Sequence, residues 1–203
     1  MGSVLVEEAA LREQRINATA AASGSRVSPQ FLFERMKHYA SLNQRPYQMA
    51  CQELHLKCLP WRSDLGLETL RPQVDETLII LKKHFHIGLI ANQPLGTMAR
   101  LEAFGIAQYF EVIVASAEEG LEKPDHTIFR RALERAKASP GESLMVGDRL
   151  DNDMTPAMEL GFCTAWVKYD MGSYGDVSLL PRKPDFTIAG IEEIPSLLGI
   201  KNE

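Results

Sequence analysis

The sequence has little of several features that would mark a special class of protein. No apolar run approaches the roughly 20 residues that a membrane-spanning helix needs, so we expect no membrane partner. The formal net charge is −5 and no basic run is present, which argues against a nucleic-acid partner. The first residues also lack the basic start and long apolar core of a signal peptide.

Cysteine is scarce as well. Cys51, Cys58 and Cys163 cannot all pair within one chain, and their spacing fits no zinc motif. We interpret them as reduced thiols in a cytoplasmic protein of unknown oligomeric state. The rest is ordinary for a globular chain: 203 residues, of which 45% are hydrophobic and 24% charged, are enough to bury a core.

Two regions of different pattern follow one another along the chain. Up to residue 70, an Ala-rich stretch and two segments that begin at Ser28-Pro29 and Pro46 favour helices, and no strand is convincing before residue 85. From residue 71 onward, short apolar runs alternate with helical segments. The expected strands are 87–91, 111–115, 143–146, 164–167 and 186–188, and the expected helices are 73–84, 97–104, 125–138, 155–160 and 191–198.

Alternating strands and helices predict an α/β fold in which a Rossmann-like parallel sheet is flanked by helices. We therefore divide the chain into residues 1–70, an N-terminal helical part, and residues 71–203, the α/β core. Ligands of such folds bind at the carboxyl ends of the strands. That rule points to Asn92, Ser116 and Asp148, each of which directly follows an expected strand.

The strongest chemical signal is an acidic cluster after the strand that ends near Val146. Asp148, Asp151 and Asp153 lie within six residues. Carboxylate oxygens are the ligands that Mg²⁺ prefers, so the cluster indicates a magnesium site. The alternative is an acidic turn in which Asp153 caps the following helix.

Two weaker signals come from single polar residues. Lys123 precedes Pro124, which holds the lysine in an extended segment where its ammonium could neutralise a phosphate. Asn92 and Gln93 directly follow an apolar strand, where a side-chain amide could donate to a phosphate oxygen. Taken alone, these residues are better explained as a surface lysine before a helix and a turn-forming asparagine before proline.

Together and in this order, the strand ending in Asn92, the segment GLEKPD around Lys123 and the segment VGDRLDND around Asp148 resemble the haloacid dehalogenase-like (HAD) hydrolase superfamily. The resemblance runs from about Arg71 to Leu198. It implies that the helices before residue 70 form an α-helical cap. It also implies a Mg²⁺-dependent phosphatase that acts on a small phosphorylated substrate.

The resemblance also implies roles for individual residues. Asp148 would bind Mg²⁺. Asp153 would be a second acid at the metal, where it would support the metal's water ligands, and a catalytic residue. The backbone carbonyl of Gly2 would be a further metal ligand. Lys123 would stabilise the transferred phosphoryl group, and Asn92 with Gln93 would bind its oxygens. One departure is Ala91, which stands where the family has Ser or Thr and cannot donate a hydrogen bond to phosphate.

A second departure concerns the nucleophile. The family's first motif places an attacking aspartate at the end of a strand, but the first aspartate of this sequence is Asp64. Gly2 would take the position of the usual general acid, which implies that the sequence starts inside the motif. We expect a further strand with the aspartate upstream in the natural protein, and little or no activity without it. Without that strand, the strands ending at Asn92 and Gly147 would leave unpaired edges, which either close on each other or weaken the fold.

Three other functions fit parts of the pattern. A catalytically dead HAD-like binding protein is favoured by Ala91 and by the lack of the attacking aspartate. A 2-haloacid dehalogenase does not need the acid that Gly2 replaces, although the acidic cluster suits Mg²⁺ better. A receiver-type signalling domain would need an aspartate at the end of a mid-chain strand, and Asn92 and Ser116 occupy two such positions.

Overall fold

The order of helices and strands after residue 71 follows the predicted pattern. The computed structural model describes residues 1–24, 26–62 and 64–200. Within these ranges no helix is both long enough and apolar enough to cross a membrane. The helices and strands, in chain order, are β1 (Val6–Glu7), α1 (Ala9–Ala22), α2 (Pro29–Ser41), α3 (Pro46–Glu53), β2 (Thr69–Leu70), α4 (Val74–Lys82), β3 (Gly88–Ala91), α5 (Thr97–Ala103), β4 (Val112–Ala115), α6 (Ser116–Glu119), α7 (His126–Ala136), β5 (Leu144–Gly147), α8 (Thr155–Leu160), β6 (Cys163–Val167), β7 (Phe186–Ile188) and α9 (Ile194–Leu197).

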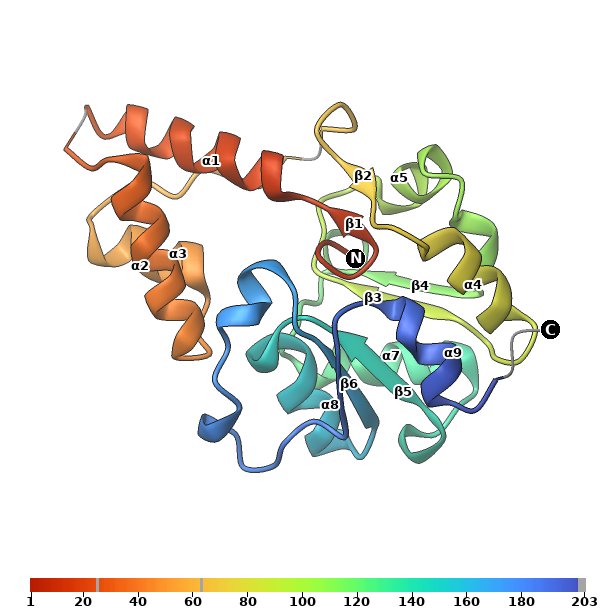
Figure 1. The fold of residues 1–203 in the computed structure, drawn as a ribbon. Helices are drawn as coiled ribbons and strands as arrows, with labels where there is room; N and C mark the ends of the chain where they lie inside the picture. The colour runs from red at the N-terminus through yellow and green to blue at the C-terminus, as the bar shows by residue number, and fades with distance from the viewer. Residues whose placement is uncertain (25, 63, 201–203) are drawn as a thin grey trace.

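The parallel strands form the α/β core that the sequence predicts. β3 pairs with β4, and β6 lies between β5 and β7, with all of these pairs parallel. Helices cover both faces, as expected for strands joined by helical crossovers. α7 packs on β3 and β4, and α8 packs on β6. α4 and α9 contact each other and belong to a different apolar cluster from α7 and α8. The fold is therefore Rossmann-like, with the helices and strands in layers (Figure 1).

Two apolar clusters fill the space on the two sides of the strands. Alternate residues of β6 point in opposite directions, because successive side chains of a strand leave opposite faces. Ala165 and Val167 join the cluster that includes α4 and α9, while Trp166 joins the cluster under α7 and α8. All three residues are buried, so β6 is covered on both faces.

Helices α1 to α3 form a separate group beside the sheet (Figure 1). Their apolar faces meet in a cluster of their own that is built on Leu32, Met36 and Tyr47. The segment before α1 packs elsewhere, since Val4 and Val6 belong to the core cluster of the α/β part. The division at residue 70 into two domains stays a prediction.

The expectation of no strand before residue 85 is wrong in one detail. β1 pairs antiparallel with β2, with Val6 opposite Leu70 and Glu7 opposite Thr69. Each strand has only two residues, too few to show an alternating pattern in the sequence. This pairing brings the two connections to the helical group together at the edge of the core.

The unpaired edges expected on β3 and β5 are present and do not close on each other. Within the described ranges no ladder joins the β3–β4 pair to the β5–β6–β7 sheet. The N-terminal residues instead contact both halves, since Met1, Val4 and Leu5 are buried in the core that both sheets share. Apolar side chains thus join the two halves without backbone hydrogen bonds between them.

Candidate active site

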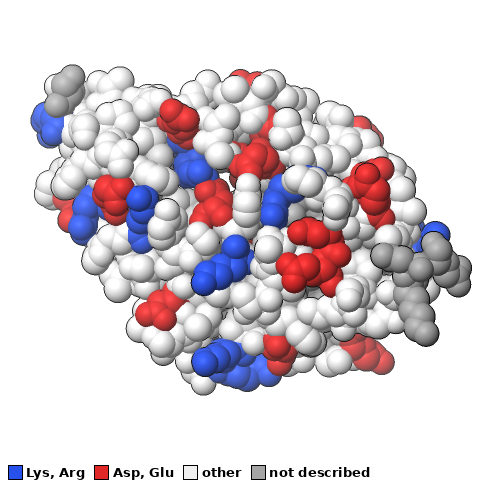
Figure 2. All heavy atoms as spheres, viewed as in Figure 1, with Lys and Arg blue, Asp and Glu red and all other residues white. Residues whose placement is uncertain are grey.

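The residues predicted from the sequence lie together at the carboxyl ends of the strands. Asn92 follows β3, Asp148 follows β5, and Lys123 lies in the connection between α6 and α7. One cavity of about 270 Å³ joins them to side chains of α1 and α3. All six predicted site residues line it: Gly2, Asn92, Gln93, Lys123, Asp148 and Asp153. On the face of the molecule shown in Figure 2, acidic and basic side chains lie intermixed.

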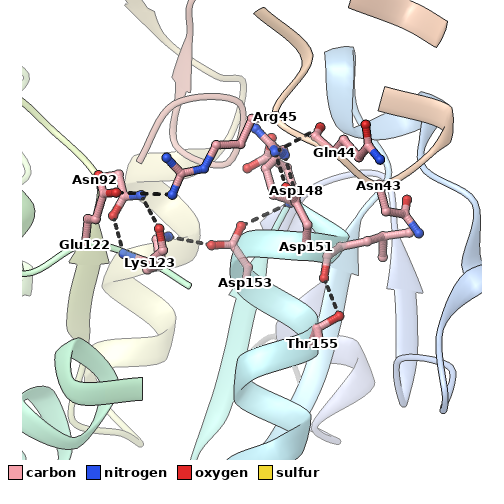
Figure 3. A network of polar contacts seen from close by, with 12 residues as sticks. Asn43, Gln44, Arg45, Asn92, Glu122, Lys123, Asp148, Asp151, Asp153 and Thr155 are labelled. Carbon is pink, nitrogen blue, oxygen red and sulfur yellow. Dashed lines mark hydrogen bonds and ion pairs between the residues drawn. The ribbon is translucent and has the colours of Figure 1, made fainter. Parts of the chain in front are cut away.

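Lys123 forms a buried ion pair with Asp153 (Figure 3). Its Nζ lies 2.5 Å from Asp153 Oδ1, and the backbone N–H of Arg149 donates to Asp153 Oδ2 at 3.0 Å. Burial by itself would raise the pKa of Asp153, but the charge and the hydrogen bond of Lys123 hold that pKa below its ordinary value. Asp153 is therefore ionised, and it fixes the lysine ammonium at the wall of the cavity.

Asn92 binds the backbone of Lys123 rather than leaving its amide free. Its Nδ2 donates to the carbonyl oxygen of Lys123 at 2.9 Å, and its Oδ1 accepts from the N–H of Lys123 at 2.8 Å. The next residue is also engaged, because the backbone N–H of Gln93 donates to Ser116 Oγ and its side-chain oxygen accepts from Arg100. Direct binding of phosphate by the Asn92 and Gln93 side chains stays a prediction, whereas the positioning of Lys123 by Asn92 is a contact in the structure.

The acidic cluster divides into two parts. Asp151 is turned away from the cavity and forms an ion pair with Arg149 at 2.5 Å. Asp153 lies in a π-helical turn, Leu150–Met154, that leads into α8. It accepts from the backbone N–H of Arg149, which precedes this turn, so it does not cap the N-terminus of α8 in the way the acidic-turn alternative supposed. The sequence could not show this division, because the π turn changes the spacing of side chains within it.

Gly147 explains how the acids come so close to the strand end. A Cβ atom on this residue would lie 2.5 Å from both Cβ and Oδ2 of Asp153. Any side chain at position 147 would therefore displace Asp153 and its partner Lys123. The Gly-Asp pair in the motif is needed for this close approach.

The Asp148 carboxylate differs from the other two acids. No hydrogen bond or ion pair joins it to any residue that the structure describes, although its backbone carbonyl accepts from Trp166 Nε1 at 2.9 Å. Burial, followed by the negative charge of Asp153, raises the pKa of Asp148 to about 7. The charges of the Met1 ammonium, Arg149 and Lys123 act in the opposite direction, but no cation of the described residues lies within ion-pair distance of this carboxylate.

The donor set fits a Mg²⁺ ion. Two carboxylates, Asp148 and Asp153, line the cavity with the backbone of Gly2, and hard oxygen atoms of this kind are what Mg²⁺ binds. Burial is the main cause of the raised pKa of Asp148, and a bound cation would favour the ionised form of this carboxylate. Among the described residues, no three His, Cys, Asp or Glu side chains gather as a metal site, so carbonyl and water oxygens would have to complete the coordination.

Gly2 lies against a buried glutamate. A Cβ atom on Gly2 would lie 1.9 Å from Glu8 Oε2, so the Glu8 carboxylate fills the space that a side chain at position 2 would need. The carbonyl oxygen of Gly2 accepts from the backbone N–H of Val4 at 2.7 Å. Its second lone pair is free for a further contact, and its role as a metal ligand stays a prediction.

The opposite wall of the cavity comes from the helical group and contains residues that sequence reasoning missed. Arg12 and Arg15 lie three residues apart on α1, which places them on one face of that helix. The aromatic side chains of Tyr47 and Trp61 line the same wall. The spacing of the two arginines was the signal available in the sequence, but helix propensity alone did not distinguish it from an exposed face.

These features can be compared with known proteins. The model of the haloacid dehalogenase-like hydrolase family matches residues 60–161, which include β3, Lys123 and the acidic cluster. The chain belongs to the haloacid dehalogenase-like hydrolases. Its similarity to this family confirms the resemblance seen in the motifs.

Curated relatives of this HAD-like chain include phosphatases. A glyceraldehyde 3-phosphate phosphatase of Pyrococcus furiosus is 33% identical over 131 residues, which are 64% of this chain and 53% of the relative. The N-acylneuraminate-9-phosphatase of Rattus norvegicus is 30% identical over 141 residues, 68% of this chain and 56% of the relative. The chain thus spans about half the length of the curated relatives that it matches.

Solved structures show the same fold over nearly the whole chain. A HAD phosphatase from Thermococcus onnurineus superposes with a TM-score of 0.67 at 20% identity, covering 100% of this chain and 97% of that one. A 2-haloacid dehalogenase from Pseudomonas syringae superposes with a TM-score of 0.61 at 20% identity, covering 98% and 95%. These likenesses establish the HAD fold, and they do not separate a phosphatase from a dehalogenase.

Proposed function

We propose that this HAD-like protein is a Mg²⁺-dependent phosphatase of a small phosphorylated metabolite. The observation that carries the proposal is the meeting, in one cavity, of a fixed ammonium on Lys123 and an unpartnered carboxylate on Asp148. A cation bound at Asp148 and the ammonium of Lys123 together suit a phosphate dianion. The names of the curated phosphatase relatives support the same reaction class.

Each residue has a distinct part in this proposal. Asp148 and the carbonyl of Gly2 would hold Mg²⁺, which neutralises charge on the phosphoryl oxygens when it is bound. Asp153 fixes Lys123 and adds negative charge on the metal side of the cavity. Lys123 stabilises the charge that develops on the phosphoryl group, and Asn92 holds the backbone of Lys123 in place. Gln93 adds polar surface at the same wall.

Binding of orthophosphate tests the proposed site without requiring turnover. We expect isothermal titration to show orthophosphate binding that strengthens in the presence of Mg²⁺. Lys123→Met should weaken this binding at least tenfold, because the phosphate loses the ammonium of Lys123. Lys183→Met, which removes an exposed lysine, is the matched control and should leave binding unchanged. Orthophosphate binding that is indifferent to both Mg²⁺ and Lys123 would refute the proposal.

Turnover also needs a nucleophile. An aspartate that attacks phosphorus forms a covalent intermediate. Of the three aspartates that line the cavity, Asp148 is assigned to the metal, while Asp153 pairs with Lys123 and Asp170 pairs with Arg12. We therefore propose that residues 1–203 alone hydrolyse phosphate esters slowly or not at all. The test compares p-nitrophenyl phosphate hydrolysis by this chain with that by a variant extended by a short apolar strand and an aspartate before Met1. Equal rates with Mg²⁺ would contradict the proposed need for that aspartate.

A second candidate function is binding of a phosphorylated ligand without hydrolysis. Ala91, which has no hydroxyl to donate to phosphate, and the lack of an attacking aspartate in the cavity favour it. Phosphate binding that persists while the extended variant stays inactive would select this function. Release of chloride from 2-chloropropionate by the extended variant would instead select dehalogenation.

A further inference from the structure

Four cationic side chains line the cavity, and three of them have an acidic partner. Lys123 pairs with Asp153, Arg149 pairs with Asp151, and Arg12 pairs with Asp170. The fourth is Arg15, on the α1 wall. No carboxylate in the described part of the chain lies within ion-pair distance of its guanidinium, so its positive charge faces the cavity uncompensated by an acid.

Arg15 is nevertheless held firmly in one place. Its Nε and Nη2 both donate to the carbonyl oxygen of Leu59, at 3.0 and 2.5 Å. The guanidinium carbon lies 3.6 Å from the centre of the Tyr47 ring and 5.5 Å from that of Trp61. Tyr47 is itself fixed, because its hydroxyl contacts Thr19 Oγ1 at 2.8 Å and accepts from the N–H of Leu59 at 2.8 Å. A preorganised guanidinium loses little freedom when it binds an anion.

The cavity therefore has unpaired charges of opposite sign on its two walls. Among the described residues, no cation lies within ion-pair distance of Asp148 on the core side, and no anion lies within that distance of Arg15 on the helical side. The wall around Arg15 is otherwise mostly apolar, with Ile16, Met36 and Met171 beside it. A single guanidinium in apolar surroundings suits a planar group with one negative charge, which it can bind through two parallel hydrogen bonds.

We propose that Arg15 is a specificity-determining residue that binds a carboxylate on the substrate, so that the substrate is a phosphate monoester of a small carboxylic acid. This inference rests on the proposed function, since it places the phosphate at Lys123 and Asp148 and the carboxylate at Arg15. The size of the cavity, about 270 Å³, fits a compact molecule with its two anionic groups at opposite ends. Arg15 on α1 thus distinguishes the substrate from a phosphate ester that has no carboxylate.

A matched pair of ligands isolates the carboxylate. 3-Phosphoglycerate and glycerol 3-phosphate differ only in a carboxylate against a hydroxymethyl group, and their affinities can be measured by isothermal titration with Mg²⁺ present. We expect the protein to bind 3-phosphoglycerate at least tenfold more tightly. Arg15→Gln should abolish this preference while leaving the affinity for orthophosphate and glycerol 3-phosphate unchanged. Arg15→Lys should keep part of the preference, since it keeps the charge and loses the planar pair of donors.

The controls separate specificity from folding. Arg35→Gln removes an arginine of the same helical group that pairs with Glu53 at 2.8 Å, outside the cavity, and should change neither affinity. Unchanged thermal unfolding of Arg15→Lys guards against a loss of the Leu59 contacts. Equal binding of the two esters by the unaltered protein would overturn the inference. An equal loss of both in Arg15→Gln, or tighter binding of glycerol 1,3-bisphosphate than of 3-phosphoglycerate, would do the same.

Failure of the proposed function gives a different result. In that case orthophosphate does not bind, whatever residue stands at position 15. D-Glycerate, which has the carboxylate but no phosphate, then tests Arg15 by itself. Binding of D-glycerate that depends on Arg15 supports the carboxylate site, and binding that does not depend on Arg15 overturns it.

Discussion

The side-chain amide of Asn92 and the backbone of Lys123 exchange two hydrogen bonds, of 2.9 and 2.8 Å, across 31 positions of the sequence. This pairing joins the end of β3 to the segment that contains the lysine of the candidate site. A side chain with both a donor and an acceptor at its tip is required, because one bond runs in each direction. Asn92 thus determines where the Lys123 ammonium lies, in addition to any contact of its own with a ligand.

Two substitutions at Asn92 test this positioning role. Asn92→Ala removes both hydrogen bonds and should lower the free energy of unfolding by about 1–3 kcal/mol. Asn92→Asp keeps the acceptor for the Lys123 N–H but loses the donor, so it should cost less stability in urea unfolding. Orthophosphate affinity should fall in the same order for the two variants. A loss of affinity in Asn92→Ala with no change in stability would assign Asn92 to the ligand instead of to Lys123.

The ion pair of Lys123 with Asp153 should be costly to break from one side. Both side chains are more than nine-tenths buried, so Lys123→Met leaves a carboxylate without its cation in the protein interior. We expect a loss of about 3–5 kcal/mol in the free energy of unfolding, measured with urea. The double variant Lys123→Met, Asp153→Asn removes the stranded charge and should recover part of that loss. Additive losses in the two single variants would show that the pair is not coupled.

The parallel core could be predicted from the sequence because its signals are local. The apolar runs that form β3, β4, β5 and β6 are short and bounded by polar residues, and the helices between them repeat their apolar residues at helical spacing. The convergence of Asn92, Lys123 and Asp148 followed from one rule, that the carboxyl ends of parallel strands lie on one side of a sheet.

What the sequence could not show depends on contacts between distant segments. β1 and β2 are two residues each, and their pairing of Val6 with Leu70 spans the entire helical group. The same applies to the wall around Arg15, whose stacking on Tyr47 is set by how α1 and α3 pack. The sequence did not predict that Asp151 and Asp153 have different partners, because both are acids in one short segment. Their side chains are separated by the π-helical turn, which the sequence did not indicate.

The raised pKa of Asp148 makes stability depend on pH in a definite direction. Between its unfolded value near 3.8 and its folded value of about 7, the unfolded chain ionises while the folded protein keeps the proton. Folding is therefore less favourable as pH rises through this interval, by roughly 1–4 kcal/mol in total. Asp148→Asn should remove this dependence and unfold at a higher temperature than the unaltered protein at pH 8 without metal. A lower unfolding temperature for the variant would contradict the argument.

Mg²⁺ should stabilise the folded protein more strongly as pH rises, which is opposite to the pH dependence that Asp148 causes without metal. The ion binds the ionised carboxylate, so the rise in unfolding temperature that Mg²⁺ causes should grow as pH increases from 5 to 8. Asp148→Asn should show little of this rise at any pH. Thermal unfolding with and without Mg²⁺, at a series of pH values and constant ionic strength, measures both effects together.

Gly147 should be among the least replaceable residues near the site. Gly147→Ala places a methyl group 2.5 Å from Asp153 atoms, and we expect a loss of about 1–3 kcal/mol in stability together with weaker orthophosphate binding. Gly141→Ala is the matched control, because no atom lies within 4 Å of its added methyl group. Its stability should stay the same or rise slightly. Equal effects of the two substitutions would show that the close approach of Asp153 to β5 is not needed.

Arg100 on α5 connects the core to both ends of the helical group. Its guanidinium forms ion pairs with Glu8, which directly precedes α1, and with Glu68, which directly precedes β2, and it also donates to Gln93 beside Asn92. Arg100 and Glu68 are buried. One core side chain therefore holds both connections of the helical group against the cavity wall.

Arg100→Met should therefore loosen the helical group more than the core. Glu68 and Glu8 would lose the cation that they share, and the cost of this loss falls on the segments that connect α1 and β2 to the core. We expect proteolysis to cut these connections, near residues 8 and 68, sooner in this variant than in the unaltered protein. Arg131→Met, which removes an exposed arginine on α7, should not change the cleavage pattern.

Because Arg15 reaches the cavity only when α1 is held in place, the preference for 3-phosphoglycerate should fall in Arg100→Met while orthophosphate binding is affected less. A variant that keeps this preference in full would show that the helical group is positioned by its other contacts.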